Sequence, residues 1–483
     1  MLSDEQERED IMQNMLNKYF ASHREEIIAR LARLAAIPSV MGTPEEGMPY
    51  GRAVDDALCA AADLFREEGF SAERDPDGHF VLASYGEGER TIGIFAHADV
   101  VPAGLGWTVT EPFSPLRREG ALVGRGVEDN KSGIIAALYL LKAVRELSLP
   151  VNAKILVFIG GCEESGMHDI KAFNKKHKAP DVSLVPDNSF PFSLGEKGRI
   201  TAWIASPYML GDILDFHGGN AYNAVMDEVT VTLARSSALA AALGDAVADR
   251  PEMTLRVGEE EITLTVKGRS AHAAAPAKGI NAAGLAANLL ADCPALAPDD
   301  RIVMRSASLF LSEPNGAPLG IAGNDGPFGN RTAVIGMARV RDGRLYLSQD
   351  IRYGAALAWS DLEPAVLDNL EAEEWEMIPV SKQDGFDLGD DSPLSAALLA
   401  TYKRVTGRAA AKPYRSFGGT YARCLPMAYS IGTVLGGTRP DFIPEGHGGA
   451  HAPDEFISED GYLAALPVMA EFLITVDEYL NNV

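Results

Sequence analysis

Histidine and carboxylate side chains recur next to short apolar runs in the first part of the chain. The residues concerned are His97, Asp99, Asp129, Glu163, Glu164 and Asp187. Taken singly, each is an ordinary turn residue or helix cap. Taken together, they favour one site, because ligands of open α/β sheets bind beyond the carboxyl ends of successive strands. A later segment that contains His447 and His451 supplies two further histidines.

This set of residue types indicates metal chemistry. A mixture of imidazole and carboxylate suits zinc, manganese or cobalt better than a thiolate site would. Two metal ions about 3.5–4 Å apart can hold both a carbonyl oxygen and an attacking water. Such a pair needs one carboxylate to bridge the metals and another, unbound carboxylate to take the proton of the water.

The elements that must position these residues alternate between strand and helix. Apolar periodicity predicts helices over residues 6–36 and 131–147, and strands over residues 81–84, 91–96, 155–159 and 183–186. The run at 155–159 is continuously apolar, as buried parallel strands are. The fold class predicted is therefore α/β, with a mostly parallel sheet and helices on both faces.

The middle of the chain has a different pattern. Residues 228–233 and 261–266 alternate between apolar and polar, a helix follows at 281–290, and Arg341-Asp342-Gly343 is typical of a hairpin turn. An inserted α+β domain is predicted here. The alternation of helices and strands returns near residue 390. The prediction is therefore one catalytic domain formed by residues 1–195 and 389–483, interrupted by a lid domain of residues 196–388.

Composition excludes several classes of function. The chain has 483 residues, 46% of them hydrophobic, and a formal net charge of -25. Such an acidic surface repels phosphate backbones, so a nucleic-acid partner is not expected. The four cysteines lie far apart, which favours reduced thiols. With neither a signal-peptide pattern at the start nor an apolar run long enough for a membrane, a cytoplasmic location is expected.

The order of the motifs resembles a known family. His97-x-Asp99, Gly124-Arg125-Gly126 with Asp129 and Lys131, Glu163-Glu164-x-Gly166, Asp187 and His451-x-Pro453-Asp454-Glu455 stand as in the dinuclear-zinc family of carnosinases, aminoacylases and glutamate carboxypeptidases. Within it, the length and the large insert resemble PepV-type dipeptidases. The resemblance covers nearly the whole chain, and it is more specific in the catalytic parts than in the insert.

The resemblance implies a role for each catalytic residue. Two Zn²⁺ ions, for which Mn²⁺ or Co²⁺ could substitute, would be held by His97 and Asp187 at one site and by Glu164 and His451 at the other. Asp129 would bridge the metals, and Asp99 would hold His97 in its tautomer. Glu163 would activate a metal-bridging water as the general base. His451 is preferred over His447 because of its motif, and a cis peptide between Asp129 and Asn130 is expected.

Substrate-binding residues are implied mainly in the insert, which the family uses as a lid. His272 and Asn223 would stabilise the oxyanion, Arg352 would receive the carboxylate of the substrate, and Gly418 and Gly419 would line the pocket. Three features depart from the family pattern. Asn130 replaces an aspartate that is not a ligand, and Lys131-Ser132-Gly133 replaces the commoner Lys-Gly. Met226 stands where proline is usual, which weakens the assignment of Asn223.

The predicted function is metal-dependent hydrolysis of small peptides, above all unblocked dipeptides, by a monomer. Within the same family, an N-acyl-amino-acid deacylase or an aminopeptidase is the alternative. An inactive metal-binding module would have lost a ligand or Glu163, and all of these residues are present. An NTPase is disfavoured because Asn130 stands where a P-loop has glycine before Lys131-Ser132.

Overall fold

The computed structural model describes residues 4–271, 273 and 276–482. Contacts divide the chain into two units. The first comprises Met1–Leu194, Leu388–Tyr414 and Gly419–Val483, and the second comprises Gly195–Asp387 and Arg415–Gly418. Residues 389–483 were predicted to belong to the catalytic domain, and within them the short segment Arg415–Gly418 packs with the second unit.

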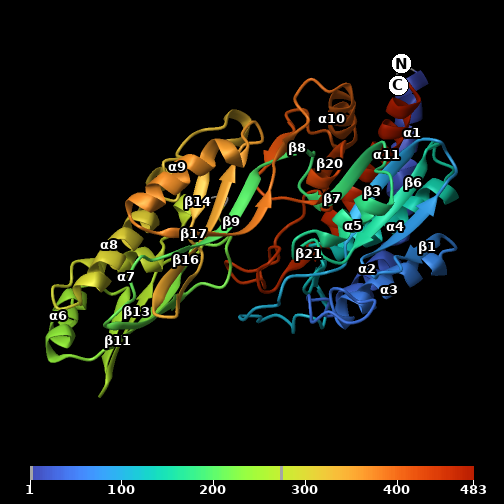
Figure 1. The fold of residues 1–483 in the computed structure, drawn as a ribbon. Coiled ribbons are helices and arrows are strands. Elements are labelled where there is room, and N and C mark those ends of the chain that lie inside the picture. Colours follow the sequence, from blue (N-terminus) through green and yellow to red (C-terminus); the bar gives the residue numbers. More distant parts are fainter. Residues whose placement is uncertain (1–3, 272, 274–275, 483) are drawn as a thin grey trace. The chain divides into compact units, whose positions relative to one another are not determined.

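The first unit combines helices with two sheets (Figure 1). Its helices are α1 (Asp4–Ser22), α2 (Arg24–Ala35), α3 (Arg52–Glu67), α4 (Lys131–Glu146), α5 (His168–Lys176), α10 (Pro393–Thr406) and α11 (Glu459–Asn481). Its strands are β1 (Ser71–Arg74), β2 (Phe80–Tyr85), β3 (Thr91–His97), β4 (Leu116–Arg118), β5 (Ala121–Val123), β6 (Lys154–Gly160), β7 (Val182–Asn188), the start of β8 (Ser193–Glu196), β20 (Ala428–Gly432) and β21 (Phe456–Ser458).

The large sheet of this unit has a parallel centre. Its strands run in the order β1-β2-β6-β3-β7-β20-β8. Strands β6, β3, β7 and β20 pair in parallel, whereas β1 with β2, β2 with β6, and β20 with β8 pair antiparallel. The expected parallel order therefore holds for the central strands only. A short turn joins β1 to β2, and short turns connect antiparallel strands, whereas parallel strands need long crossovers.

Helices cover both faces of this sheet. On one face Phe158 of β6 stacks on Phe95 of β3, and Phe173 of α5 packs edge-on against both rings. On the other face the neighbouring residues Val157 and Ile159 join the core that contains α4 and α11. Helix α4 is buried from Lys131 to Val144, as expected for a helix that is apolar on all sides.

The predicted helix over residues 6–36 is broken near its middle. Helix α1 ends at Ser22 and α2 begins at Arg24. At the break, the Ser22 hydroxyl donates a hydrogen bond to the Tyr19 carbonyl at 2.7 Å, and His23 Nδ1 lies 2.8 Å from the same oxygen. Side chains that take up backbone carbonyls in this way compete with the helical hydrogen bonds.

The second unit is an antiparallel sheet with helices. Its strands are the end of β8, β9 (Gly198–Ala205), β10 (Ile213–Gly218), β11 (Glu228–Ala234), β12 (Met253–Val257), β13 (Glu261–Lys267), β14 (Thr332–Val334), β15 (Ala338–Arg341), β16 (Arg344–Tyr353), β17 (Glu376–Gln383) and β18 (Phe386–Asp387). Strand β19 (Tyr414–Ser416) spans a boundary between the units. The helices are α6 (Ser237–Val247), α7 (Ala282–Ala291), α8 (Pro298–Ser312) and α9 (Trp359–Ala372).

The alternation predicted for this unit appears as burial on one face of its sheet. Val229, Val231 and Leu233 of β11 point into a core that they share with the alanine-rich helix α7. The order β12-β13-β11-β10-β15-β16-β9-β17 is antiparallel throughout. Over the described residues, every helix falls short of the length or the apolar character that a membrane-spanning segment needs.

Candidate metal centre

Three adjacent parallel strands bring the polar segments to one edge of the large sheet. His97 is the last residue of β3, Asp187 lies near the end of β7, and β6 ends at Gly160, shortly before Glu163 and Glu164. Strand β3 pairs in parallel with both β6 and β7. The carboxyl ends of these strands therefore lie together, which is the usual ligand position in such sheets.

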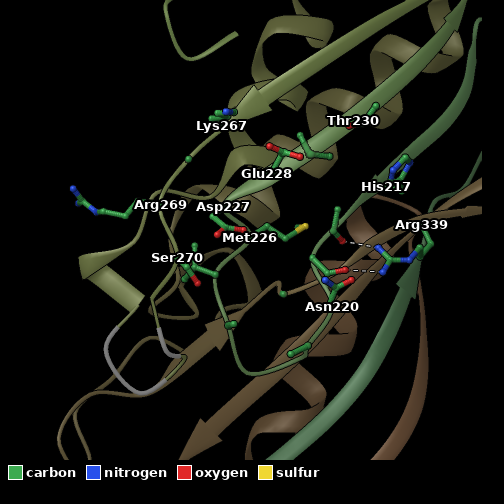
Figure 2. Close-up of a pocket in the computed structure, with 18 residues that line it drawn as sticks. His217, Asn220, Met226, Asp227, Glu228, Thr230, Lys267, Arg269, Ser270 and Arg339 are labelled. Carbon is green, nitrogen blue, oxygen red and sulfur yellow. Dashed lines mark hydrogen bonds between the residues drawn. The ribbon is translucent and has the colours of Figure 1, made fainter. Parts of the chain in front are cut away.

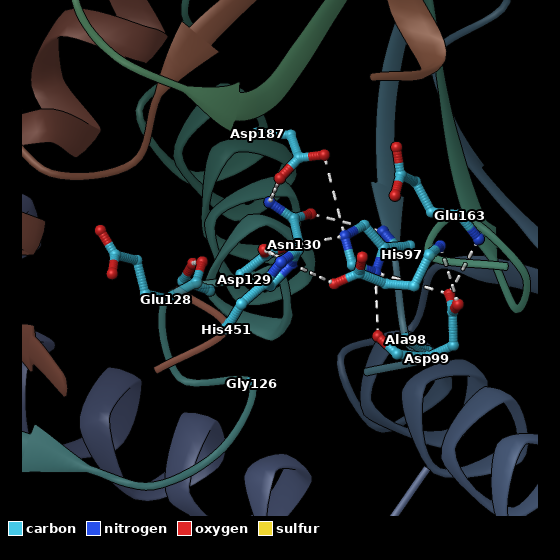
Figure 3. Close-up of polar contacts among 12 residues, drawn as sticks. His97, Ala98, Asp99, Gly126, Glu128, Asp129, Asn130, Glu163, Asp187 and His451 are labelled. Carbon is cyan, nitrogen blue, oxygen red and sulfur yellow. Dashed lines mark hydrogen bonds and ion pairs between the residues drawn. The ribbon is translucent and has the colours of Figure 1, made fainter. Parts of the chain in front are cut away.

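The five residues predicted as metal ligands lie in one cluster in the first unit (Figure 3). His97 Nε2 is 3.0 Å from Asp129 Oδ1 and 3.7 Å from Asp187 Oδ2. His451 Nε2 is 3.1 Å from Asp129 Oδ2 and 2.9 Å from Glu164 Oε1. These side chains form two groups, one of His97, Asp129 and Asp187 and the other of Asp129, Glu164 and His451. Asp129 belongs to both groups and presents a different oxygen to each histidine. The donor set fits two metal ions that share one carboxylate.

The electrostatics of the cluster favour positive charge. Burial alone would lower the pKa of His451, but its hydrogen bonds with Asp129 and Glu164 raise it to about 11. For His97, burial likewise opposes charge, and hydrogen bonds with Asp129 and Asp99 outweigh it and raise the pKa well above the usual value. Imidazolium protons and metal ions relieve the same repulsion among these carboxylates.

Glu163 stands apart from both groups. Burial raises the pKa of its carboxyl group well above the usual value, although nearby His97 lowers it. Its Oε1 atom is buried and receives no hydrogen bond from the described residues. Buried polar atoms are nearly always paired, so an unpaired one indicates a functional position.

Asp99 contacts the loop that carries the two glutamates. Its Oδ1 accepts a hydrogen bond from the Glu163 backbone N–H, and its Oδ2 accepts one from Glu164, each at 3.1 Å. His97 Nδ1 lies 2.9 Å from the backbone carbonyl of Asp99 and 3.5 Å from its carboxylate. The backbone of Asp99 is thus the nearer partner of the His97 ring, while its carboxylate fixes the glutamate loop.

Asn130 connects two of the predicted ligands. Its Nδ2 donates hydrogen bonds to the Pro186 carbonyl and, at 3.1 Å, to Asp187 Oδ1. Its Oδ1 accepts a hydrogen bond of 3.3 Å from the His97 backbone N–H. The peptide bond between Asp129 and Asn130 is cis, as the resemblance implied. The sequence marked Asn130 only as a departure from the family pattern, and these contacts could not be predicted from it.

Glu455 is a further residue whose role was not predicted. The buried carboxylate accepts hydrogen bonds from the backbone N–H groups of Gly126 (3.0 Å), Glu128 (2.9 Å) and Asp129 (3.2 Å), and from Arg125 Nη1 at 2.7 Å. It fixes the loop that presents Asp129. Its place in the His451 motif was the only signal in the sequence.

The two candidate histidines, His447 and His451, have different partners in the structure. His447 Nδ1 lies 2.7 Å from Asp454 Oδ2, and the Asp454 carboxylate accepts hydrogen bonds from the Thr108 and Val109 backbone. His451 instead lies in the metal-type cluster. His447 therefore braces the loop next to that cluster.

The predicted substrate-binding residues divide between the units. Gly419 belongs to the first unit, and Asn223, Arg352 and Gly418 belong to the second. His272 lies outside the described residues. The Asn223 side chain is half-buried, and its backbone carbonyl accepts a hydrogen bond of 2.8 Å from the Ala273 N–H.

Arg352 is buried and held in one orientation. Its Nε donates to Asp350 Oδ1 at 2.8 Å, and its Nη1 donates to the Phe417 carbonyl at 2.7 Å. Arg199, its direct partner on the neighbouring strand, pairs with the other carboxylate oxygen of Asp350 at 2.7 Å. Arg352 Nη2 also donates to Asp350 Oδ2 at 3.3 Å, so a further carboxylate would meet the remaining N–H groups of Nη1 and Nη2.

A cavity of about 870 Å³ opens beside β10 and β11 of the second unit. Arg339 donates hydrogen bonds of 2.6 Å to the carbonyls of Gly218 and Gly219 at its rim (Figure 2). Acidic side chains, Asp227 and Glu228, face basic ones such as Lys267. Because its lining carries both charges and comes from residues other than the metal-type cluster, the cavity does not change the location of the candidate site.

The contacts of Glu455 generate a first prediction. Glu455→Gln leaves Arg125 buried without a counter-charge, which costs about 3–5 kcal/mol, and places an amide N–H against backbone donors. We expect lower thermal stability and reduced metal content in the purified protein, measured by calorimetry and elemental analysis. Glu471→Gln is the matched control, because Glu471 is also buried and pairs with Arg404 at 2.9 Å. Equal metal loss in both variants would refute a specific role for Glu455.

Comparisons with known proteins agree with this geometry. The sequence profile of Peptidase family M20/M25/M40 matches residues 93–475. The chain is 29% identical over 463 residues to the Bacillus subtilis protein named "Putative dipeptidase YtjP", covering 93% of this chain and 96% of that protein. Human carnosine dipeptidase 1 has a similar fold, with a TM-score of 0.58 and 17% sequence identity. The match covers 96% of this chain and 100% of that one. The Saccharomyces cerevisiae dipeptidase Dug1p gives a TM-score of 0.58 at 14% identity, covering 96% of this chain and 98% of that one. Since the profile spans well over half of its length, the chain belongs to peptidase family M20/M25/M40 and is a hydrolase of peptides.

Proposed function

We propose that this peptidase hydrolyses unblocked dipeptides with two divalent metal ions, in the first place zinc. One observation carries the proposal: two groups of metal-type side chains share Asp129. In the proposal His97 and Asp187 hold one ion, Glu164 and His451 hold the other, and Asp129 bridges them. Metal ions bound there supply Lewis acidity, which polarises an amide carbonyl and lowers the pKa of water.

Glu163 is the proposed general base. Its backbone N–H is anchored by Asp99, and its Oε1 is buried without a hydrogen-bond donor among the described residues. Burial raises the pKa of its carboxyl group, which makes the carboxylate a better proton acceptor. In the reaction Glu163 takes the proton of the attacking water and delivers it to the leaving amine. Asp99 serves by keeping the backbone of Glu163 and Glu164 in place.

The second unit contributes recognition of the substrate. Arg352, oriented by Asp350, is proposed to bind the terminal carboxylate, and Gly418 and Gly419 to line the pocket. Asn223 and His272 are proposed to stabilise the oxyanion. A substrate whose terminal carboxylate is held in a fixed position would be cleaved at the amide bond next to its terminal residue.

The choice of dipeptides rests on two supports. The names of YtjP, carnosine dipeptidase 1 and Dug1p all refer to dipeptidases. A free amino terminus also needs a nearby carboxylate. The candidate site supplies carboxylates close to the metal-type cluster, among them Asp99 and Glu163.

Metal binding should release protons. In the metal-free cluster the pKa of His451 is about 11 and that of His97 is also raised, so both rings are protonated at pH 7. A histidine must be neutral to bind a metal. We therefore expect the apparent affinity for zinc to rise with pH. Calorimetric titrations in buffers of different ionisation enthalpy should show a net release of protons on binding. Binding without proton release would contradict the ligand assignment.

The two neighbouring glutamates should behave differently. Glu163→Gln should retain metal and lower kcat by about 10²–10⁴-fold, the usual scale for a lost general base. Glu164→Gln should lower metal content, because it removes a ligand charge. The two variants are controls for each other, with metal content and kcat measured on the same preparations. Equal metal loss in both would rule out this division of roles.

A substrate screen tests the proposed specificity. Free dipeptides should be cleaved well, and tripeptides and N-acetylated amino acids poorly. Arg352→Ala should raise KM by an amount equivalent to about 1.5–3 kcal/mol, the scale of a lost charge-assisted pair. Arg344→Ala is the control, because Arg344 lies on the same strand and donates to the Ser206 carbonyl. Faster hydrolysis of N-acetyl amino acids would instead identify a deacylase with the same metal ligands.

A further inference from the structure

A buried hydrogen bond between Asp169 and Tyr421 lies beside the metal-type cluster in the first unit. Both side chains are 0% exposed, and the Tyr421 hydroxyl donates to Asp169 Oδ2. The pair passes directly over Gly160 at the end of β6, where a Cβ atom would collide with the Tyr421 hydroxyl and the Asp169 carboxylate. Only glycine fits beneath this hydrogen bond.

Asp169 also holds the start of the loop that carries the two glutamates. Its Oδ2 accepts a hydrogen bond of 2.8 Å from the Cys162 N–H. The next two amides, those of Glu163 and Glu164, donate to Asp99 at 3.1 Å each. Three consecutive backbone N–H groups are thus bound by two buried carboxylates. The Cys162 carbonyl is bound as well, by the Met167 N–H at 2.8 Å.

Tyr421 connects this loop to two other parts of the candidate site. Its ring packs edge-on against the ring of His97, with centroids 6.4 Å apart. It also follows Gly418, Gly419 and Thr420, and the chain returns from the second unit to the first between Gly418 and Gly419. The hydroxyl of Tyr421 therefore joins the glycine-rich segment to the glutamate loop.

The charge of Asp169 makes the hydrogen bond from Tyr421 stronger. The pKa of Asp169 is about 6, because burial and the nearby charge of Asp99 raise it more than the hydrogen bonds from Tyr421, Ile170 and Cys162 lower it. The group is therefore mostly ionised at neutral pH. Hydrogen bonds to an ionised acceptor are roughly twice as strong as neutral ones. Loss of the Tyr421 donor leaves the carboxylate with the two backbone donors of Cys162 and Ile170.

We propose that Tyr421 and Asp169 are positioning residues: their hydrogen bond fixes the Cys162 amide and so places Glu163 for proton transfer. The role given to Glu163 rests on the function proposed above. A displacement of about 1 Å at a reacting group can cost up to about 10²-fold in rate. Because the bond holds the base and not the substrate, its loss should lower kcat more than it changes KM.

Tyr421→Phe tests the proposal, since it removes the hydroxyl and keeps the ring. We expect unchanged metal content, KM within about two-fold, and kcat lower by about ten-fold or more. Hydrogen exchange of the metal-loaded full chain should be faster in a peptide covering residues 160–167. Tyr429→Phe is the matched control, because Tyr429 is also buried and its hydroxyl lies 3.0 Å from Ser395 Oγ, and it should match the wild type in every measurement.

Asp169→Asn is the second variant, which keeps an acceptor for Cys162 but removes the charge, and it should change kcat and exchange in the same direction. Wild-type kcat and exchange in Tyr421→Phe would overturn the proposal, as would an equal loss in Tyr429→Phe. If both Tyr421→Phe and Asp169→Asn fail to fold, the pair serves the fold and the proposal is also overturned. If the wild type does not cleave dipeptides, the proposed function fails, and the exchange comparison alone decides the role of the pair.

Discussion

Repulsion between partly buried carboxylates is the constraint on which the first unit depends. Asp129, Glu163, Glu164 and Asp187 are crowded at one edge of a sheet, where burial raises the pKa of Glu163 and Glu164. Like charges at such separations cannot be held in a low-dielectric interior unless cations or hydrogen-bond donors compensate them. The histidines supply part of that compensation, and the shared position of Asp129 between them follows from it.

The loops around the cluster must be rigid to keep these carboxylates at fixed positions relative to one another. A surrounding layer of carboxylates, formed by Asp99, Asp169 and Glu455, binds backbone N–H groups of the loops that carry the cluster. A carboxylate that accepts several backbone N–H hydrogen bonds holds those backbone groups in fixed positions. These three carboxylates therefore fix the backbone of the loops that carry the cluster, and none of them belongs to either group of metal-type side chains.

The sequence was most informative where chemistry and strand ends coincide. His97, Asp129, Glu164, Asp187 and His451 could be predicted as one cluster because their types, spacing and order resemble a known family, and parallel strands gather their ends at one edge. The helix and strand patterns of the core were also visible, apart from the break at His23, where side chains take up helical carbonyls. That break depends on local side-chain geometry and not on periodicity.

Contacts between residues distant in sequence could not be predicted. Glu455 binds amides 326 to 329 positions earlier in the chain, and Tyr421 meets Asp169 across 252 positions. No periodicity or local motif encodes such partners. The same holds for the hydrogen bonds that the Asp99 carboxylate, which also lies 3.5 Å from the His97 ring, accepts from the glutamate loop. It holds as well for Arg415–Gly418, whose four residues pack with the second unit.

The two groups that share Asp129 become available at different times during synthesis of the chain. A nascent chain that has been translated through Asp187 already contains all of the group formed with His97. The other group must wait for His451, which is separated from Glu164 by 287 positions that include the second unit. Since a domain folds as a unit and the core of the first unit includes side chains of α10 and α11, this unit can complete its fold only after the second unit has been synthesised.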